Sequence, residues 1–411
     1  MDRIFERAAR SLDRPLDAAE LYRVVAPAVA ALKCGHTEVF LPEAVREEIR
    51  RQLLPLKVKV LDRKVYVLLD LANADHRLAG AEIRAVNGVP AGDVVTALLA
   101  AAPGDGDVMT SRQIAIGGFH FAEYLTALLN LRSPYEVTLA ERGTGRLETV
   151  RLAGAELSGL QKSAEAQSPP PSQRPAFEQL DHGRIAVMKI REFGGLNGFF
   201  RDAFGAMQAQ QTAALILDLR GNDGGEDDQG KLLLSYLIDK PFKYYSDLVL
   251  NKTSFRFAKY AKGAGALPIW MLSRGKDGRY HLVRHPNWGL QQPSLPTFRG
   301  RVMILIDGGS FSTTAEFLSQ AHFHRRAAFI GEESGGGYYG NTSGFMPELT
   351  LPHSKIRVVV PLVGYYVAVA AGQPANHGVI PDHPVHYTID EVLAGKDKEM
   401  ELALSLARQS V

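Results

Sequence analysis

The chain has 411 residues, with 47 basic and 45 acidic side chains and a single cysteine, Cys34. This length is enough for two or three domains and a sizeable core. The near balance of charge gives no electrostatic basis for binding nucleic acid. One cysteine excludes an internal disulfide, and no apolar run is long enough to span a bilayer.

Residues 1–54 are predicted to form a helical cap. The first seven residues include four charged side chains and lack the apolar core of a signal peptide, so no signal peptide is predicted. Apolar side chains recur at helical spacing over residues 16–33, and Gly35 is a typical helix stop. A second helix is expected over residues 42–54, ending before Pro55.

The spacing of apolar residues changes to that of strands from residue 56 onward. A strand is expected over residues 65–69, followed by a helix over 91–101 and a strand over 135–139. Residues 80–88 end in an Asn-Gly turn signal and resemble a segment of PDZ-like domains. The resemblance implies a β-rich PDZ-like domain over residues 56–155.

Residues 163–175 contain three consecutive prolines and are predicted to be a stiff linker. Beyond it, over residues 176–411, strands and helices alternate, which is typical of an α/β domain with a mostly parallel sheet. Strands are expected over 184–190, 213–219 and 301–306, and helices over 196–209, 227–238 and 312–325. The apolar residues of 240–300 show no clear helix or strand period, and this segment is expected to form an excursion near the active site.

Two glycine-rich strand ends carry the chemistry. Residues 215–225 read Leu-Ile-Leu-Asp-Leu-Arg-Gly-Asn-Asp-Gly-Gly, a buried strand that stops in a glycine turn. Residues 302–316 contain a second buried strand that delivers Ser312 to the first turn of a helix. A hydroxyl at a strand-to-helix turn, facing free backbone N–H groups, is the arrangement that acyl-transfer enzymes use. The alternative is that Ser312 is an ordinary helix N-cap.

The sequences of these segments resemble those of the C-terminal-processing and tricorn-type serine peptidases, a family that includes the modules of interphotoreceptor retinoid-binding protein. The resemblance spans about residues 180–400. It is carried, in chain order, by Asp218-Leu-Arg-Gly-Asn-Asp-Gly-Gly225, Phe311-Ser-Thr-Thr-Ala-Glu-Phe317, Gly331-Glu-Glu-Ser-Gly-Gly336 and Gly378-Val-Ile-Pro-Asp382. It implies a crotonase-like ββα superhelix as the catalytic domain, with Ser312 as its nucleophile. Because relatives are often exported, it also implies a periplasmic or secreted protein.

A serine hydroxyl needs a base to remove its proton. The lysine that the C-terminal-processing branch places after the Gly-Glu motif is missing, since Gly336, Gly337 and Tyr338 stand there. The sequence Gly35-His36-Thr37 is similar to the pattern from which the tricorn-type branch takes a histidine. The resemblance therefore implies His36 as general base, with a rise of kcat/KM near an unperturbed histidine pKa of about 6.5. The alternative is that His36 is a polar surface or capping residue.

The remaining parts of the site are less constrained. For the residue that orients His36, Glu332 and Glu333 are candidates, and solvated loop glutamates are the alternative. For the oxyanion hole, the resemblance implies backbone N–H groups of Gly224 or Gly225 and of Thr313. Glycine allows close approach of the backbone, and N–H groups at a helix start are unpaired.

These observations predict a serine peptidase that acts on peptides or unfolded protein tails through an acyl-enzyme, with no metal or other cofactor. A catalytically silent peptide- or ligand-binding module on the same scaffold is the alternative, because some relatives bind ligands. A crotonase-type acyl-CoA enzyme, with an oxyanion hole but no nucleophilic serine, is a third. The oligomeric state is open.

Overall fold

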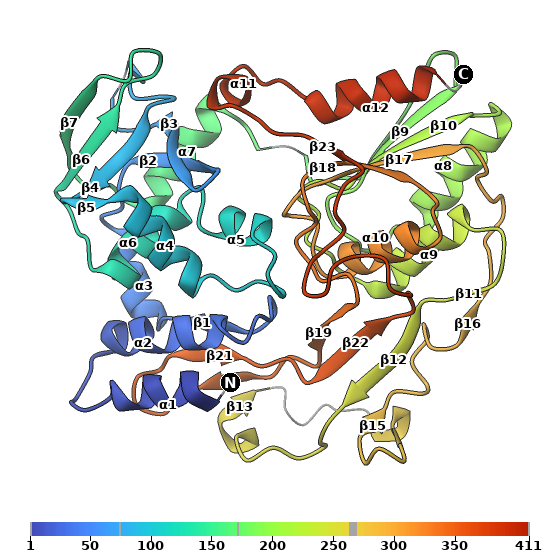
Figure 1. The fold of residues 1–411 in the computed structure, drawn as a ribbon, viewed down its shortest axis with the longest axis horizontal. Helices are drawn as coiled ribbons and strands as arrows, with labels where there is room; N and C mark the ends of the chain where they lie inside the picture. The colour runs from blue at the N-terminus through green and yellow to red at the C-terminus, as the bar shows by residue number, and fades with distance from the viewer. Residues whose placement is uncertain (1, 74, 171, 263–268, 410–411) are drawn as a thin grey trace.

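The computed structural model describes residues 2–73, 75–170, 172–262 and 269–409. Two halves lie side by side (Figure 1): an N-terminal half, residues 2–167, and a C-terminal half, residues 176–409. Both contain helices and strands, so the fold is mixed α/β as predicted. Within the described ranges, no helix has the length and apolar character needed to cross a bilayer.

The N-terminal half is built on an antiparallel sheet in the order β2-β3-β4-β6-β7, with β5 paired to β4. Its strands are β2 (Leu56–Leu61), β3 (Lys64–Asp70), β4 (Glu82–Val86), β5 (Val89–Pro90), β6 (Tyr135–Ala140) and β7 (Leu147–Leu152). Its helices are α1 (Asp2–Arg10), α2 (Ala18–Ala30), α3 (Glu43–Arg50), α4 (Ala91–Ala101), α5 (Thr110–Ala115), α6 (His120–Leu129) and α7 (Leu157–Gln167).

The predicted cap and the predicted β-rich domain share one hydrophobic core. Tyr22 and Ala26 of α2 and Ile49 of α3 belong to the same buried cluster as Val67 of β3 and Leu98 of α4. The two regions are therefore packed as one unit, because the apolar faces of α2 and α3 have the sheet and its helices as their partner. Whether they unfold separately stays a prediction.

The C-terminal half is built on a six-stranded sheet in the order β23-β18-β17-β10-β9-β8. All its neighbouring pairs are parallel except β8 with β9. The strands are β8 (Ala176–Leu180), β9 (Ile185–Lys189), β10 (Ala214–Asp218), β17 (Arg301–Ile306), β18 (Ala328–Gly331) and β23 (His383–Pro384). The helices are α8 (Asn197–Ala209), α9 (Asp227–Leu237), α10 (Thr313–Phe323), α11 (Ile389–Leu393) and α12 (Lys398–Arg408).

Alternate residues of β10 point to opposite faces of this sheet, as the period of a strand requires. Leu215 and Leu217 pack in the cluster formed with α8, α9 and α10, whereas Ala214 and Ile216 pack in the cluster formed with α12. Both faces are thus covered by helices, which explains the continuous apolar run in this strand.

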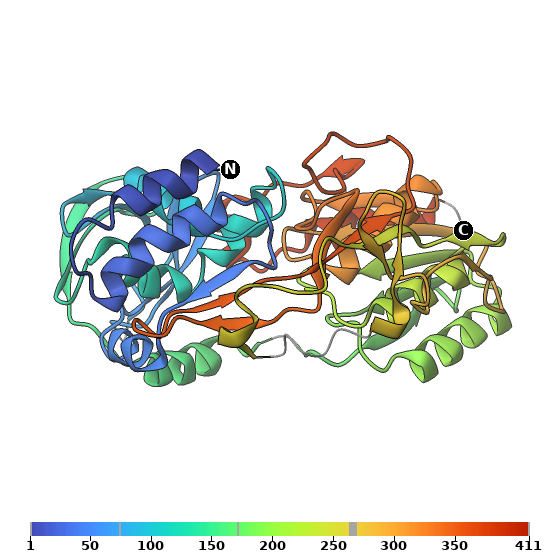
Figure 2. The ribbon, with the colours of Figure 1, turned by 90° about the horizontal axis from the view of Figure 1, so that it is seen from below.

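An arm from the C-terminal half reaches under the N-terminal half (Figure 2). It contains β20 (Glu348–Thr350) and β21 (Arg357–Val359), and β21 pairs antiparallel with β1 (Glu38–Phe40). Ile356 at its tip is fully buried in the core of the N-terminal half. This pairing joins the chain near residue 38 to the C-terminal half, and it positions the loop before β1.

The predicted excursion over residues 240–300 holds short strands, and residues 263–268 of it lie outside the described residues. The strands and one-turn helices are β11 (Phe242–Lys243), β12 (Tyr245–Leu250), η1 (Ala258–Tyr260), β13 (Ala261–Lys262), η2 (Ile269–Met271), β14 (Ser273–Arg274), β15 (Tyr280–His281) and β16 (Leu290–Gln291). Strand β12 pairs with β22 (Val363–Val367), which pairs with β19 (Gly340–Gly344). This region therefore forms a wall beside α10.

The predicted linker begins later than expected. Residues 163–167 belong to α7, where Leu160 and Ala164 are buried on the helix face that meets the N-terminal half. Helical packing thus continues until the prolines, which cannot extend a helix. Residue 171 of the linker lies outside the described residues.

Candidate active site

Ser312 lies between β17 and α10, where the chain turns from strand to helix. Its backbone has φ 54° and ψ −126°, a conformation that non-glycine residues rarely adopt. Such backbone strain costs roughly 1–3 kcal/mol and is typical of nucleophile turns. The Ser312 side chain makes no capping hydrogen bond to α10. The simple N-cap interpretation of this serine is therefore wrong.

The Ser312 hydroxyl instead meets the ring of His36, with 3.0 Å between Oγ and Nε2. His36 lies in the loop between α2 and β1, and the β1–β21 pairing carries this loop to the C-terminal half. The His36 ring stacks on Phe311, the neighbour of Ser312, with 4.6 Å between ring centroids. Two residues 276 positions apart are thus within hydrogen-bond distance.

Burial lowers the pKa of His36 from 6.5 to about 4, because the protonated ring would lose its solvation. His36 is therefore neutral at pH 7, the state in which it can accept a proton. The pH step that the sequence placed near 6.5 moves down accordingly. The other ring nitrogen, Nδ1, is buried and has no hydrogen-bond partner among the described residues.

Neither candidate for orienting His36 contacts it. Oε1 of Glu333 lies 2.9 Å from Nδ1 of His377 and accepts a hydrogen bond of 3.0 Å from the N–H of Gly378. Glu332 lines a separate cavity with residues of β2 and α5. Both glutamates follow β18, but only the side chain of Glu333 contacts the segment that returns toward β23. The assignment of a third member to Glu332 or Glu333 is wrong in this structure.

The glycine turn faces Ser312 closely. A Cβ atom on Gly224 would lie 2.7 Å from Cβ of Ser312, and one on Gly225 would lie 2.2 Å from the carbonyl oxygen of Phe193. Only glycine fits at either position. The N–H of Gly224, however, donates to Oδ1 of Asn222 at 3.0 Å. Of the two glycines, Gly225 is therefore the better oxyanion donor, and it lines the cleft together with Thr313.

Asn222 fastens the glycine turn to the nucleophile turn. Its buried Oδ1 accepts hydrogen bonds from Gly224 N–H and from the hydroxyl of Thr314 at 2.8 Å, and its backbone carbonyl accepts from Phe311 N–H at 3.0 Å. The Thr313 hydroxyl adds a bond of 2.8 Å to the carbonyl of Gly225. These bonds preorganise the two candidate donors, Gly225 and Thr313, relative to Ser312.

Asp218 and Arg220 of the first motif are structural. Arg220 contacts Asp218 at 2.9 Å, Asp397 at 2.7 Å and Glu399 at 3.2 Å, so it ties the end of β10 to α12. Burial alone would raise the pKa of Asp218, but hydrogen bonds from Arg220 and Arg191 outweigh it and lower the pKa to about 2.

Asp105 is a residue of the site that the sequence did not single out. It is 6% exposed, and its carboxylate accepts hydrogen bonds from the N–H of Gly35 at 2.7 Å and of Gly337 at 3.2 Å. It therefore holds the His36 loop against the segment after β18. The only signal was the glycine-rich stretch around it, residues 104–107, which gives no indication of its partners.

Ser312 and His36 open into a cleft of about 780 Å³. Six carboxyl side chains line it, and none of its lining residues is a lysine or arginine: Glu38, Asp223, Glu226, Asp227, Glu316 and Glu348. Glu316 is buried, which raises its pKa from 4.5 to about 7. The cleft is thus rich in carboxyl groups, although Glu348 pairs with Arg357 at 2.6 Å, in a chain whose net charge is only +2.

Comparison with known proteins identifies the family and the fold of the chain. A strained serine beside a histidine, at the end of a parallel sheet, defines a candidate hydrolase of α/β fold. Residues 184–385 match the model of Peptidase family S41, and this part of the chain belongs to that family. Family membership supports a peptidase function. No curated protein sequence matches the chain.

Solved structures show the same fold over nearly the whole chain. Mature CPAF is 15% identical, with a TM-score of 0.64, and the match covers 98% of this chain and 90% of that one. Mature CPAF complexed with lactacystin gives a TM-score of 0.63 at 15% identity, with the same coverage of 98% and 90%. At this identity the likeness shows the fold alone.

Proposed function

We propose that the chain is a serine peptidase of the histidine-using kind, in which Ser312 is the nucleophile and His36 the general base. The observation that carries the proposal is the contact of 3.0 Å between His36 Nε2 and Ser312 Oγ. Neutral His36 takes the hydroxyl proton as Ser312 attacks the peptide carbonyl, and later gives that proton to the leaving amine. An acyl-enzyme on Ser312 is then hydrolysed by water.

The developing oxyanion is stabilised by the backbone N–H groups of Gly225 and Thr313. Among the described residues His36 Nδ1 has no carboxylate partner, and the orientation of the ring comes from stacking on Phe311 and from the hydrogen bond of Gly35 to Asp105. A base oriented in this way lacks the anion that would stabilise the imidazolium, so its turnover is expected to be lower than that of a complete triad.

The finer description of the fold is part of the proposal. The C-terminal half is compatible with a crotonase-like superhelix, and residues 56–155 with a PDZ-like domain. Limited proteolysis tests the domain division, because the proline segment after α7 is its predicted cleavage site. A single cooperative unit that resists cleavage there would overturn the division into domains.

The activity is tested with a fluorophosphonate probe and a peptide-library digest. Wild type is expected to be labelled at Ser312 and to cleave peptides, and Ser312→Ala is expected to lose both while remaining folded. Ser343→Ala is the matched control, since Ser343 lines the same cleft. Neighbouring Ser310 is unsuitable, because its buried hydroxyl donates to Leu219 and accepts from the N–H of Asp307.

The alternative is a silent binding module, which the unpartnered Nδ1 of His36 favours. It predicts peptide binding without labelling, so the same probe separates the two functions. Matched library peptides with Lys or Glu beside the scissile bond add a second measurement. The carboxyl-lined cleft is expected to favour the lysine peptides, less strongly as the salt concentration rises.

A further inference from the structure

The N-terminal half contains a second cavity, of about 150 Å³, that is partly open to solvent and distinct from the active cleft. It lies between α2, α3, α4 and α6, which surround it on the left side of Figure 1. Residues 37–41, which follow His36 in the chain, form one of its walls. Glu38 lines both this cavity and the active cleft.

The cavity wall combines an apolar part with a polar part. Its small and branched side chains come from all the surrounding elements: Ala26, Val29 and Ala30 of α2, Ile49 of α3, Ala101 of α4 and Ala127 of α6. A cavity of this volume holds a molecule of about the size of benzene.

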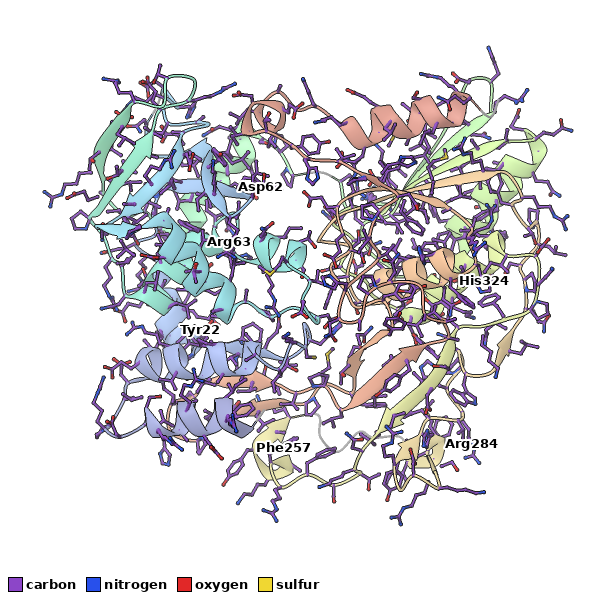
Figure 3. All side chains as sticks on the ribbon, in the orientation of Figure 1. Tyr22, Asp62, Arg63, Phe257, Arg284 and His324 are labelled. Carbon is purple, nitrogen blue, oxygen red and sulfur yellow. The ribbon has the colours of Figure 1, made fainter. Side chains whose placement is uncertain are left out.

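Two tyrosine side chains, Tyr22 and Tyr124, line this cavity. Tyr22, labelled in Figure 3, is only 6% exposed, and its hydroxyl has no hydrogen-bond partner among the described residues. Tyr124 lines the same cavity, and the part of the chain described here likewise offers its hydroxyl no partner. Both hydroxyls line the cavity without a protein partner, so each is available to donate a hydrogen bond to a bound acceptor.

The charges at the cavity cancel. Two arginines and two glutamates line it, Arg46 and Arg50 with Glu38 and Glu123, and Arg50 approaches Glu123 at 3.3 Å. The side-chain carboxyl of Glu38 has no ionic or hydrogen-bond partner among the residues described, and burial raises its pKa. The wall therefore offers phenol donors and one carboxyl acceptor without net charge, which favours a neutral ligand over an ion.

We propose that this cavity binds a small neutral molecule with a ring-sized apolar body and one amide or hydroxyl group, and that its occupant acts on the His36 loop. The ligand's polar group accepts from Tyr22 and Tyr124 and donates to Glu38. A bound ligand packs against residues 37–41, which form one wall of the cavity. This contact restrains the preceding residue, His36, in its position beside Ser312. Only this second clause rests on the proposed peptidase function.

Calorimetry with benzamide, benzoate and toluene tests the site without any activity measurement. Benzamide is expected to bind saturably, about fivefold more tightly than toluene, since one hydrogen bond contributes a factor of that order. Benzoate is expected to bind more weakly than benzamide. The absence of saturable benzamide binding, or tighter binding of benzoate, would overturn the ligand class.

Two variants locate the binding. Tyr22→Phe keeps the shape of the side chain and is expected to weaken benzamide about fivefold while leaving toluene unchanged. Ala127→Leu fills the cavity and is expected to abolish binding of both. Tyr260→Phe, at an exposed tyrosine outside the cavity, is the control. Unaltered benzamide binding by both cavity variants would place the ligand elsewhere and sink the proposal.

Coupling to the active site is measured as the rate of fluorophosphonate labelling. Saturating benzamide is expected to raise this rate at least about twofold in wild type, and not in Ala127→Leu. An unchanged rate in wild type would overturn the coupling. If wild type is not labelled at all, the proposed peptidase function fails, whereas calorimetry still decides the binding site.

Discussion

The turn that carries Ser312 and the loop that carries His36 meet at one hydrogen bond, but they are held in place differently. The serine turn is fastened to neighbouring strands of one sheet: Ser310 bonds to Leu219, and Phe311 bonds to Asn222. The histidine loop depends on elements far apart in the chain, namely Asp105 at Gly35 and β21 at β1.

This difference has a physical consequence. The serine turn is part of a packed sheet, so its strained backbone is determined by many contacts. The histidine loop is held by contacts from separate elements, and one ring nitrogen of His36 has no hydrogen-bond partner among the described residues. We therefore expect substitutions near His36 to change the alignment of the base, and substitutions near Ser312 to act on folding as well.

Replacing His36 tests the base side most directly. His36→Ala is expected to lower kcat/KM about 10²-fold or more, the usual contribution of a general base. In wild type, kcat/KM is expected to rise through a pH of about 4 and to be level at neutral pH, because burial lowers the pKa of His36 to that value. Peptide cleavage measured across this pH range provides the profile.

His353→Ala is the control, since His353 is exposed and outside the cleft. A rise of kcat/KM near pH 6.5 in wild type that is absent from His36→Ala would show that the His36 ring is more hydrated than the structure indicates. Undiminished cleavage by folded His36→Ala would remove it from the mechanism.

Asp105→Asn separates positioning from chemistry. An asparagine can accept from only one of the two N–H groups, of Gly35 and Gly337, and leaves the other facing an amide NH₂. The His36 loop is then expected to lose its alignment, which lowers kcat about tenfold with little change in KM. Peptide kinetics measured beside the thermal midpoint of each variant distinguish misalignment from unfolding.

Asp107→Asn serves as the matched control, because Asp107 is exposed and pairs with Lys33 at the surface. If Asp105→Asn keeps full kcat, the β1–β21 pairing alone holds the loop. The comparison between the two sides of the cleft would then have to be revised.

The two sides of the cleft also differ in how far the sequence predicts them. Local sequence patterns predict Ser312, the glycine turn and the helix over residues 91–101. A buried strand, a glycine turn and an amphipathic helix each depend on residues that are close together in the sequence. The predicted helix over residues 196–209 agrees with α8 to within one residue.

What the sequence could not supply depends on distant packing. The arm of β20 and β21 is short and pairs with residues hundreds of positions away, so its spacing carries no signal. Asp105 matters only because Gly35 and Gly337 lie beside it. The pKa of His36 was placed near 6.5 because burial cannot be read from the residue type. The glutamates after β18 were misassigned for the same reason, since their partner, His377, is brought to them by the fold.

The smallest expected effect is on stability, and it concerns Glu316 of α10, the helix that follows Ser312. It lies one turn along α10 from Ser312, and its carboxylate meets the hydroxyl of Tyr245 at 2.6 Å and the amide of Asn341 at 2.8 Å. The Tyr245 hydroxyl also lies 3.1 Å from Asp227. The single hydroxyl proton of Tyr245 can be donated to only one of the two carboxyls. A proton on Glu316 supplies the second hydrogen bond, so that both short contacts are satisfied.

The sign of the pH effect follows from this proton. Burial, with the charge of Asp227 adding to it, raises the pKa of Glu316 from 4.5 to about 7. Between these two values the folded protein holds a proton that the unfolded chain has lost, so stability falls as pH rises through that window. Glu316→Gln reproduces the protonated pattern and is expected to be more stable than wild type at pH 8, by about 3 kcal/mol. Glu401→Gln, at an exposed position of α12, should leave the pH dependence unchanged. Thermal unfolding from pH 5 to 8 measures both variants, and a Glu316→Gln protein that loses stability with pH as steeply as wild type would show that Glu316 is ionised throughout.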